Sequence, residues 1–408
     1  MTLATRHELG SAYREVLALS GGALGIARKD HLLSLFSGED DVVHLDLEGR
    51  LHRAWLGGRS FQRGLDGRVR RVSVSGAERS LQVEVLPAGD SARVLERVAE
   101  VVARVARELP SGTDPALADP LERAIEQARP GAVAVEAERF RSAYEPVPIL
   151  PPDQHRALVV QLTSGCSWNR CTFCHLYRDA SFAMKSPEAL GEHVQKVLDL
   201  VGRALPLRRG IFLGQANALV LAQDKLVPLL RVLARELERA GAPQGLGRLA
   251  AFVDAFTRPK SVDEWRELRD LGLRGVSLGL ESGSAEVLRT LGKPAEIDDA
   301  VALAGSLRDA GVKLGVIVLA GAGGRRLALR HVEDTVETLQ RMELGAGDRI
   351  YLSPLSVEPE STFAKSLTQL DALSRGEISA EAEELRARLR SAGVRVPIAL
   401  YDVRRFVY

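Results

Sequence analysis

The sequence predicts an α/β protein whose core is a parallel sheet of six strand–helix repeats, with a small α+β domain before it and a short extension after it. Between residues 156 and 355, β-branched apolar runs alternate with segments of helical periodicity. The strand-like runs are almost wholly apolar, as expected for parallel strands buried on both faces. The first 110 residues instead contain short alternating segments separated by turn signals.

These patterns divide the 408 residues into four parts. We expect an N-terminal α+β domain over residues 1–110, with a small antiparallel sheet and a helix at 91–109. A linker with helices follows over 111–144, and it opens with the Pro- and Gly-containing stretch PSGTDPALADP. The core occupies 145–365, and a C-terminal helix and strand occupy 366–408.

Composition and the first residues restrict the class of protein. Lys plus Arg number 55 against 54 Asp plus Glu, so a net charge of +1 gives no electrostatic indication of a nucleic acid or an anionic membrane as partner. Charged residues interrupt segment 1–22, which therefore predicts an amphipathic helix and not a signal peptide. No window reaches 18 apolar residues, so we expect no membrane span and a cytoplasmic location.

The repeats of the core can be placed in order along the chain. Predicted strands lie at 156–162, 209–213, 247–253, 275–280, 313–321 and 349–355. Predicted helices lie at 186–201, 224–241 and 331–342, and a further helix opens at Ser261, which has capping-box spacing to Glu264. Ser186 and Pro187 are suited to the start of the first of these helices, and Gly241 to the end of the second.

Six repeats with short loops imply a parallel sheet curled into a barrel or partial barrel, with a flat doubly wound sheet as the alternative. In such barrels the functional side chains lie at the carboxyl ends of the strands. The residues that directly follow each predicted strand are therefore the candidates for a functional site.

All three cysteines of the chain follow the first predicted strand, in the stretch SGCSWNRCTFCHLYRD. Cys166, Cys171 and Cys174 have the spacing C-x4-C-x2-C, and an odd number does not suit a disulfide framework. Isolated structural cysteines would not gather in one loop. Cys171, Cys174 and His175 form a C-x-x-C-H haem-attachment pattern, but this leaves Cys166 unexplained and belongs outside the cytoplasm.

Two metal centres remain as alternatives. Zinc could take three thiolates and His175, although the adjacency of Cys174 and His175 strains such a site. An iron–sulfur cluster normally takes four thiolates, so three would leave one iron with an open coordination position for a ligand. We favour the cluster and keep zinc as the rival.

Residues 164–179 resemble the cluster loop of radical S-adenosylmethionine (SAM) enzymes. The usual spacing there is C-x3-C-x2-C, often with an aromatic residue before the last cysteine, as Phe173 is here. The extra residue in the first gap is similar to a C-x4-C-x2-C subgroup. The resemblance covers about 145–365 and implies a partial (β/α)6 barrel of the TIM type, with a [4Fe–4S] cluster on the three cysteines.

The resemblance also implies an activity. SAM would bind the open iron, and an electron from a flavodoxin- or ferredoxin-like reductant would cleave it to a 5′-deoxyadenosyl radical. That radical would abstract a hydrogen atom from a substrate that the sequence does not identify. The chain has no further cysteines for an auxiliary cluster. The alternative from another class is an iron–sulfur or zinc scaffold, or an electron carrier, that never cleaves SAM.

Three strand exits, the segments that directly follow a predicted strand, occupy the positions where the resembled family contacts SAM. The second exit would meet the amino group, although the acid usual in the family is missing; the fourth would meet the ribose, and the fifth the adenine. The residues concerned, besides Phe173, are Gly214, Gln215, Ala216 and Asn217; Glu281 and Ser282; and Gly321, Ala322 and Gly323. The competing interpretation is ordinary strand–helix turns, with Ser284 as a helix cap and Glu281 solvated.

Four cations are candidates to pair with the SAM carboxylate or with an anionic substrate. They are Arg178, Lys185, Lys293 and Arg325. For each of them the competing interpretation is a solvated surface charge.

Overall fold

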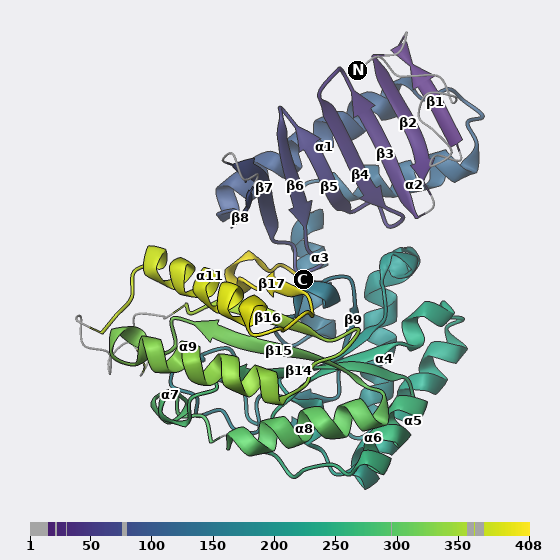
Figure 1. Ribbon diagram of the computed structural model, residues 1–408. Helices are drawn as coiled ribbons and strands as arrows, with labels where there is room; N and C mark the ends of the chain where they lie inside the picture. Colours follow the sequence, from purple (N-terminus) through teal and green to yellow (C-terminus); the bar gives the residue numbers. More distant parts are fainter. Residues whose placement is uncertain are drawn as a thin grey trace. The chain divides into compact units, whose positions relative to one another are not determined.

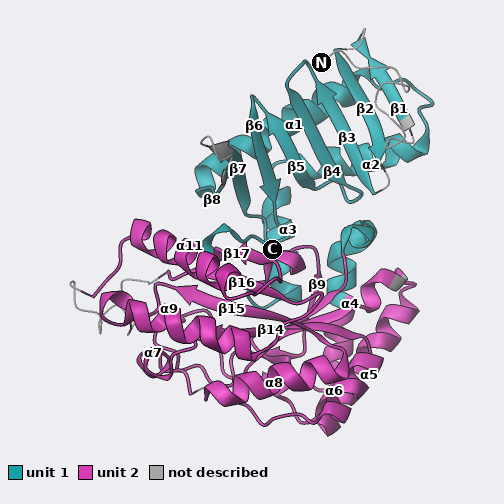
Figure 2. Ribbon diagram, viewed as in Figure 1, with its two compact units in different colours: residues 1–149, 196–208, 404–408 teal, residues 150–195, 209–403 magenta. Residues whose placement is uncertain are grey.

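The computed structural model describes residues 15–20, 23–29, 31–75, 80–294, 296–356, 363 and 371–408. The chain forms two compact units (Figures 1 and 2). The first comprises Met1–Ile149, Lys196–Arg208 and Arg404–Tyr408, and the second comprises Leu150–Gln195 and Arg209–Val403.

The first unit contains an eight-stranded antiparallel sheet in which every strand pairs with the next one along the chain. The strands are β1 (Glu15–Leu19), β2 (Leu24–Lys29), β3 (Leu32–Ser37), β4 (Asp41–Asp46), β5 (Leu51–Leu56), β6 (Arg59–Arg63), β7 (Val69–Ser75) and β8 (Ser80–Val85). Helices α1 (Ala88–Glu108) and α2 (Pro115–Gln127) lie along one face of the sheet, and α3 (Ala132–Ala143) follows (Figure 1).

Alternating strand residues and the apolar stripes of the two helices build one core. Ile26, Leu33 and Leu35 of the sheet pack with Val101 of α1 and Leu121 of α2, and all are buried. The expected antiparallel sheet and the helix at 91–109 are therefore confirmed, with the helix beginning three residues earlier, at Ala88.

The helix expected over residues 1–22 is wrong where the structure describes that segment. Glu15–Leu19 form strand β1, which pairs with β2 from Glu15 opposite Arg28 to Leu19 opposite Leu24. Backbone pairing at the sheet edge outweighs the local helical pattern, because secondary-structure propensity is weaker than tertiary context. Residues 1–14, 21 and 22 lie outside the described part of the chain.

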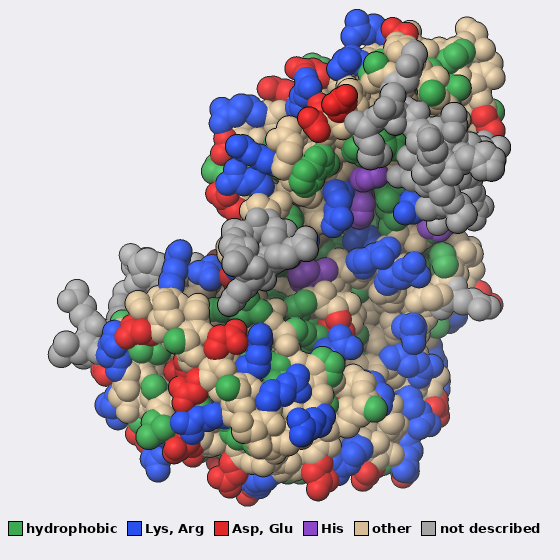
Figure 3. Space-filling view, turned by 45° about the horizontal axis from the view of Figure 1, so that its top comes forward, with side chains coloured by type: hydrophobic (Ala, Val, Ile, Leu, Met, Phe, Trp, Pro, Cys, Tyr) green, Lys and Arg blue, Asp and Glu red, His purple; other side chains and the backbone are tan. Residues whose placement is uncertain are grey.

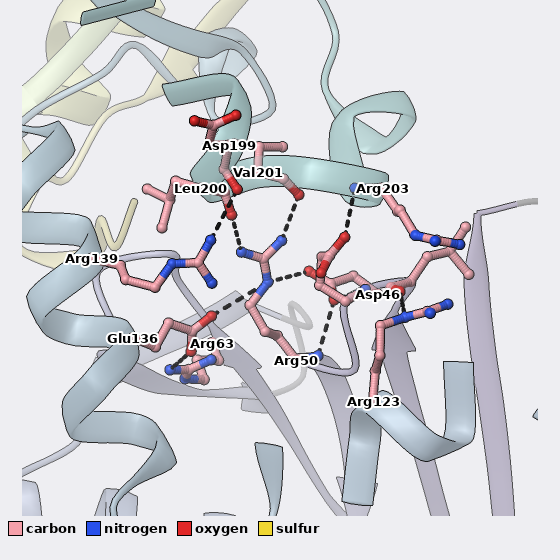
Figure 4. Close-up of polar contacts among 12 residues, drawn as sticks. Asp46, Arg50, Arg63, Arg123, Glu136, Arg139, Asp199, Leu200, Val201 and Arg203 are labelled. Atoms are coloured by element: carbon pink, nitrogen blue, oxygen red, sulfur yellow. Dashed lines mark hydrogen bonds and ion pairs between the residues drawn. The ribbon is translucent and has the colours of Figure 1, made fainter. Parts of the chain in front are cut away.

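A buried arginine joins distant segments of the first unit (Figure 4). The guanidinium of Arg50 donates to Asp46 Oδ2 at 2.7 Å and to the carbonyl oxygens of Leu200 and Val201 at 2.7 and 2.9 Å. Its Nε also lies 3.4 Å from Oε1 of Glu136. The arginine thus satisfies backbone acceptors at a helix end, where they lack intrahelical partners.

The second unit is an α/β fold on a seven-stranded parallel sheet, in the order β17-β16-β15-β14-β13-β12-β9. The strands are β9 (Leu158–Gln161), β12 (Ile211–Gly214), β13 (Leu249–Val253), β14 (Leu273–Glu281), β15 (Lys313–Ala320), β16 (Arg349–Pro354) and β17 (Ile398–Leu400). All six predicted core strands are confirmed. The seventh comes from the C-terminal extension and pairs with β16.

Helices connect these strands and cover the sheet (Figure 1). They are α4 (Pro187–Val201), α5 (Gln223–Arg239), α6 (Val262–Asp270), α7 (Ala285–Thr290), α8 (Ile297–Ala310), α9 (Gly324–Arg341) and α11 (Arg375–Ser391). The predicted capping box is confirmed, because Ser261 and Glu264 exchange both side chain–backbone hydrogen bonds. The helix predicted at 331–342 begins earlier, at Gly324, directly after the glycines that follow β15.

Charged side chains of both signs are interspersed over the face of the second unit shown in Figure 3. This matches the near balance of 55 basic and 54 acidic residues. Across the described residues, every helix is too short or too polar to traverse a lipid bilayer.

Candidate functional site

The cysteine loop begins and ends in a short antiparallel pairing beyond β9. Strand β10 (Thr163–Ser164) pairs with β11 (Ala183–Met184), so both ends of the loop are held together. Gly165 follows with φ +63°, and a Cβ there would lie 2.8 Å from the carbonyl oxygen of Ala180. Only glycine fits this positive φ and close approach without strain.

Hydrogen bonds fix the loop against the turn that follows α7. The Thr172 backbone N–H donates to Leu291 O at 2.9 Å, and its hydroxyl donates to Thr290 O at 3.0 Å. Trp168 Nε1 donates to Gly292 O at 2.9 Å. The loop therefore lies at the carboxyl end of β14, where sequence reasoning placed the candidate site.

The three thiols are free and partly exposed. Burial raises the pKa of Cys171 to about 12 and also raises that of Cys174, and each pKa responds to a neighbouring cysteine. Among the described residues, no group of three or more His, Cys, Asp or Glu side chains could hold one metal ion. A four-iron cluster binds each thiolate on a different iron, so three soft sulfur donors on one closed loop fit that group.

A buried polar chain crosses three strand exits. Lys293 Nζ donates to Glu281 Oε1 at 3.0 Å and lies 3.7 Å from Asp254 Oδ1. Asp254 Oδ2 in turn accepts a 3.0 Å hydrogen bond from Asn217 Nδ2. The polar chain runs along the carboxyl edge of the sheet, because Asn217 and Asp254 follow β12 and β13 and Glu281 ends β14.

The charged side chains of this polar chain lie close to a cysteine. Burial is the largest cause of the raised pKa of Cys171. The charge of Lys293 lowers that pKa, and the charges of Glu281 and Asp254 raise it. Burial by itself would lower the pKa of Lys293, but the two carboxylates outweigh it and raise that pKa. Lys293 therefore stays charged and compensates Glu281, which is only 8% exposed.

Backbone geometry at Glu281 is unusual. Its φ of +63° lies in the left-handed region, which non-glycine residues seldom adopt. Such conformations cluster at binding sites and active sites, where the surrounding structure holds them. The interpretation of Glu281 as a solvated residue at a helix terminus is wrong, because the carboxylate is buried and paired.

The residues after β12 divide into two roles. Gln215 Oε1 accepts the Gly165 N–H at 2.5 Å, so this side chain holds the start of the cysteine loop. Asn217 is 1% exposed, and within the described part of the chain its Oδ1 has no hydrogen-bond partner. Gly214 and Ala216 offer only backbone groups for hydrogen bonding. Asn217 thus presents a buried acceptor that lacks a donor.

Ser282 is fully buried, and its hydroxyl is hydrogen-bonded. Its hydroxyl lies 2.8 Å from His331 Nδ1 and accepts the Ser284 N–H at 3.0 Å. The expected cap at Ser284 makes no side-chain capping bond to α7. Of the two residues predicted at this exit, only Glu281 joins the polar chain beside Cys171.

The residues after β15 meet the cysteine loop through apolar packing. Phe173 packs against a buried cluster that includes Ala322, Leu291 and Leu319. Gly321 has φ +90°, and a Cβ there would lie 2.8 Å from Ile378 Cγ1. A Cβ at Gly323 would lie 2.7 Å from the Leu327 carbonyl oxygen, so this stretch is closely packed backbone.

The four candidate cations have different surroundings. Lys293 belongs to the polar chain, and Arg178 donates to the Cys174 carbonyl oxygen at 3.0 Å within the loop. Arg325 forms an exposed ion pair with Glu377. Lys185 donates its backbone N–H to Leu162 O at 3.0 Å. Only Lys293 lies beside both a candidate SAM contact and a cysteine.

Sequence reasoning missed Asp254 and Phe256. Asp254 directly follows the third strand, a position that could have drawn attention, since the other exits were searched for polar residues. Phe256 lies under Lys293, with Nζ 5.8 Å from the ring centroid, and 5.7 Å from the Trp168 ring of the cysteine loop. It therefore links the loop to the polar chain.

The fold and site define an α/β protein with a three-thiol loop at the carboxyl edge of a parallel sheet. Residues 160–339 match the family described as the radical SAM superfamily. These residues are a radical SAM domain. No curated protein matches the chain.

Solved structures of radical SAM enzymes align with part of the chain. Coproporphyrinogen III oxidase from Escherichia coli is 16% identical, with 63% of this chain and 56% of that protein covered and a TM-score of 0.44. The methyltransferase TsrM from Kitasatospora setae is 16% identical, over 51% and 38%, with a TM-score of 0.37. Methylornithine synthase is 13% identical, over 60% and 72%, with a TM-score of 0.39. The chain thus spans less than two thirds of the first two.

Proposed function

We propose that Cys166, Cys171 and Cys174 hold a [4Fe–4S] cluster whose fourth iron binds SAM, and that the enzyme cleaves SAM reductively. When bound, this pair supplies a 5′-deoxyadenosyl radical for hydrogen abstraction from a substrate. The reductant is a flavodoxin- or ferredoxin-like protein, and the reaction takes place in the cytoplasm. The parallel sheet acts as a partial (β/α)6 barrel of the TIM type, with the site at its carboxyl edge.

The observation that carries this proposal is the position of the polar chain beside Cys171. Glu281, Asp254 and Lys293 all act on the pKa of that thiol, so charged side chains lie next to the metal-binding loop. A bare cluster scaffold needs no such arrangement. SAM carries an ammonium, a carboxylate and two ribose hydroxyls, each of which requires a partner when water is displaced.

Individual residues supply partners of the required kinds. The unpaired, buried Asn217 Oδ1 is an acceptor for the SAM ammonium. Glu281 has a second carboxylate oxygen beyond the one bonded to Lys293 and can accept from ribose hydroxyls. The backbone that follows β15 at Gly321, Ala322 and Gly323 is the proposed wall for the adenine ring, since it follows a strand at the same edge of the sheet as the cysteine loop.

Gln215 and Phe173 have positioning roles in this proposal. Gln215 holds Gly165, the residue before the first cysteine, through its amide oxygen. Phe173 anchors the loop between the second and third cysteines in apolar packing beside Ala322. These contacts keep the thiols, the ammonium acceptor and the adenine wall in one arrangement, as catalysis by positioning requires.

The test is anaerobic reconstitution followed by addition of dithionite and SAM. We expect about four irons per chain and release of 5′-deoxyadenosine. Cys171→Ser should lose the cluster absorbance and the product together. Ser181→Ala, an exposed change in the same loop, should keep both. Stoichiometric zinc without iron in anaerobically purified protein would decide for the zinc alternative.

Asn217 and Glu281 are tested separately from the cluster. Asn217→Leu should retain the iron content and absorbance but bind SAM more weakly by about tenfold or more. Equilibrium binding of SAM to the reconstituted protein measures this without turnover. A fully loaded cluster that binds no SAM and yields no 5′-deoxyadenosine would identify an iron–sulfur scaffold or electron carrier instead.

A further inference from the structure

A second site lies at the opposite edge of the parallel sheet, where the strands begin. Five successive strands, β12 to β16, each have a basic residue at their first position or within two residues of it. These residues are Arg209, Arg248, Arg274, Lys313 and Arg349. All five line one cavity of about 380 Å³ within the second unit. The cysteine loop lies at the other ends of these strands, so the two sites are distinct.

Against the five cations, the described lining of this cavity has a single carboxylate, that of Asp153. Among the described residues, Arg349 pairs with Asp153 at 3.3 Å, and no ion pair engages the other four. Arg274 donates to the Arg269 carbonyl oxygen at 2.8 Å, and Lys313 donates to the Ala346 carbonyl oxygen at 2.7 Å. Carbonyl oxygens orient these side chains but leave their full charges in place.

Such a ring of like charges does not stabilise the sheet. Neighbouring cations repel one another, and four of the five side chains are exposed, so they are accessible to a ligand from solution. In the chain as a whole 54 acidic residues balance 55 basic ones, whereas one carboxylate and five cations line this cavity. An anion bound among the cations would convert the repulsion into attraction.

The cavity also provides space and a neutral hydrogen-bonding group. Glycines at positions 245 and 275 form part of its wall, and a Cβ at Gly275 would meet only ordinary contacts, the nearest at 3.5 Å. The hydroxyl of Ser277 lies on a lining residue that is 7% exposed. A volume of about 380 Å³ suits a small molecule, since ligand pockets typically range over about 300–1,000 Å³.

We infer that this cavity binds a small phosphate-bearing anion. Guanidinium groups present paired N–H donors that match phosphate oxygens, and four of the five cations are arginines. The ligand spans neighbouring strand ends, so more than one phosphate group, or one phosphate and another anionic group, fits the ring. The site is independent of the SAM chemistry proposed above.

Inorganic tripolyphosphate is the probe for the test, with the full-length protein and isothermal titration calorimetry. Wild-type protein should bind it, and Arg248→Gln/Arg274→Gln should weaken the affinity by about tenfold or more. The matched control is Arg231→Gln/Arg235→Gln, which removes two exposed arginines from α5 and should leave the affinity unchanged. Binding should also weaken as KCl is raised.

A further variant separates shape from charge. Gly275→Val keeps every cation but fills part of the cavity, so it should weaken tripolyphosphate binding while the unfolding midpoint stays close to that of the wild type. Equal weakening in both arginine pairs would show a nonspecific charge effect and overturn the proposal. Absence of binding to the wild-type protein, or binding only to long nucleic acid and not to tripolyphosphate, would also overturn it.

Discussion

The ammonium group of Lys293 lies 3.0 Å from the carboxylate of Glu281, and both side chains are buried beside the cysteine loop. Neither charge could remain there alone, because an unpaired buried charge costs several kcal/mol. The pair therefore allows Glu281, whose backbone φ is positive, to be buried at the carboxyl edge of the sheet.

Replacement of Lys293 tests this relationship. Lys293→Met should destabilise the protein by about 3–5 kcal/mol, because it leaves Glu281 buried without its cation. Thermal and urea unfolding measure the change. Lys225→Met, an exposed change on α5, should stay within about 0.5 kcal/mol of the wild type. The Lys293→Met/Glu281→Gln double variant should be more stable than Lys293→Met; if it is not, the pairing is not the cause.

Gly321 is predicted to tolerate no side chain. Gly321→Ala should cost about 1–3 kcal/mol, because φ is +90° and the new Cβ would lie 2.8 Å from Ile378 Cγ1. Gly305→Ala, within helix α8, is the control and should be neutral or stabilising. Ile378→Ala should recover part of the loss in the Gly321→Ala background. Equal unfolding midpoints for the two glycine variants would contradict the packing argument.

Arg50 should contribute far more to the stability of the first unit than a surface arginine does. Arg50→Met removes the donors to Asp46, Leu200 and Val201 and leaves those acceptors buried, so we expect a loss of about 3–5 kcal/mol. The exposed Arg203 is the control, and Arg203→Met should change stability by less than about 0.5 kcal/mol. Limited proteolysis of the first unit gives a second readout, and unchanged cleavage in Arg50→Met would contradict the expectation.

His331 and Glu381 should give opposing pH dependences. Burial lowers the pKa of His331 to about 4 from 6.5, so the unfolded chain binds the extra proton between these values and stability rises with pH there. Burial raises the pKa of Glu381 to about 7 from 4.5, so the folded chain binds the extra proton and stability falls with pH across that window.

The two slopes should largely cancel in the wild-type protein between about pH 4.5 and 6.5. In Glu381→Gln only the slope caused by His331 should remain, so that stability rises from pH 4.5 to 6.5. Urea unfolding at several pH values measures both. His331 Nε2 lies 3.5 Å from Glu381 Oε1, so a double variant should report any coupling. A flat profile in Glu381→Gln would contradict the assigned shift of His331.

The sequence alone determined the elements of the core and the location of its cysteine loop. Apolar runs such as Leu158–Gln161 and Lys313–Ala320 are long and continuous, so their strand character does not depend on distant partners. The loop was equally clear, because the only three cysteines of the chain directly follow the first strand. Glu281 and Asn217 could be named as candidates because strand exits converge at one edge.

Only the tertiary structure decided which of those candidates act together and which are occupied elsewhere. Ser282 is adjacent to Glu281 in sequence, yet its hydroxyl is bonded to His331 on α9. Asp254 joins the polar chain because β13 lies between β12 and β14 in the sheet order, which no local pattern reveals. Strand β1 likewise exists because β2 offers its edge to Glu15–Leu19. Local patterns fix backbone periodicity, whereas long-range pairing and packing decide which side chains meet.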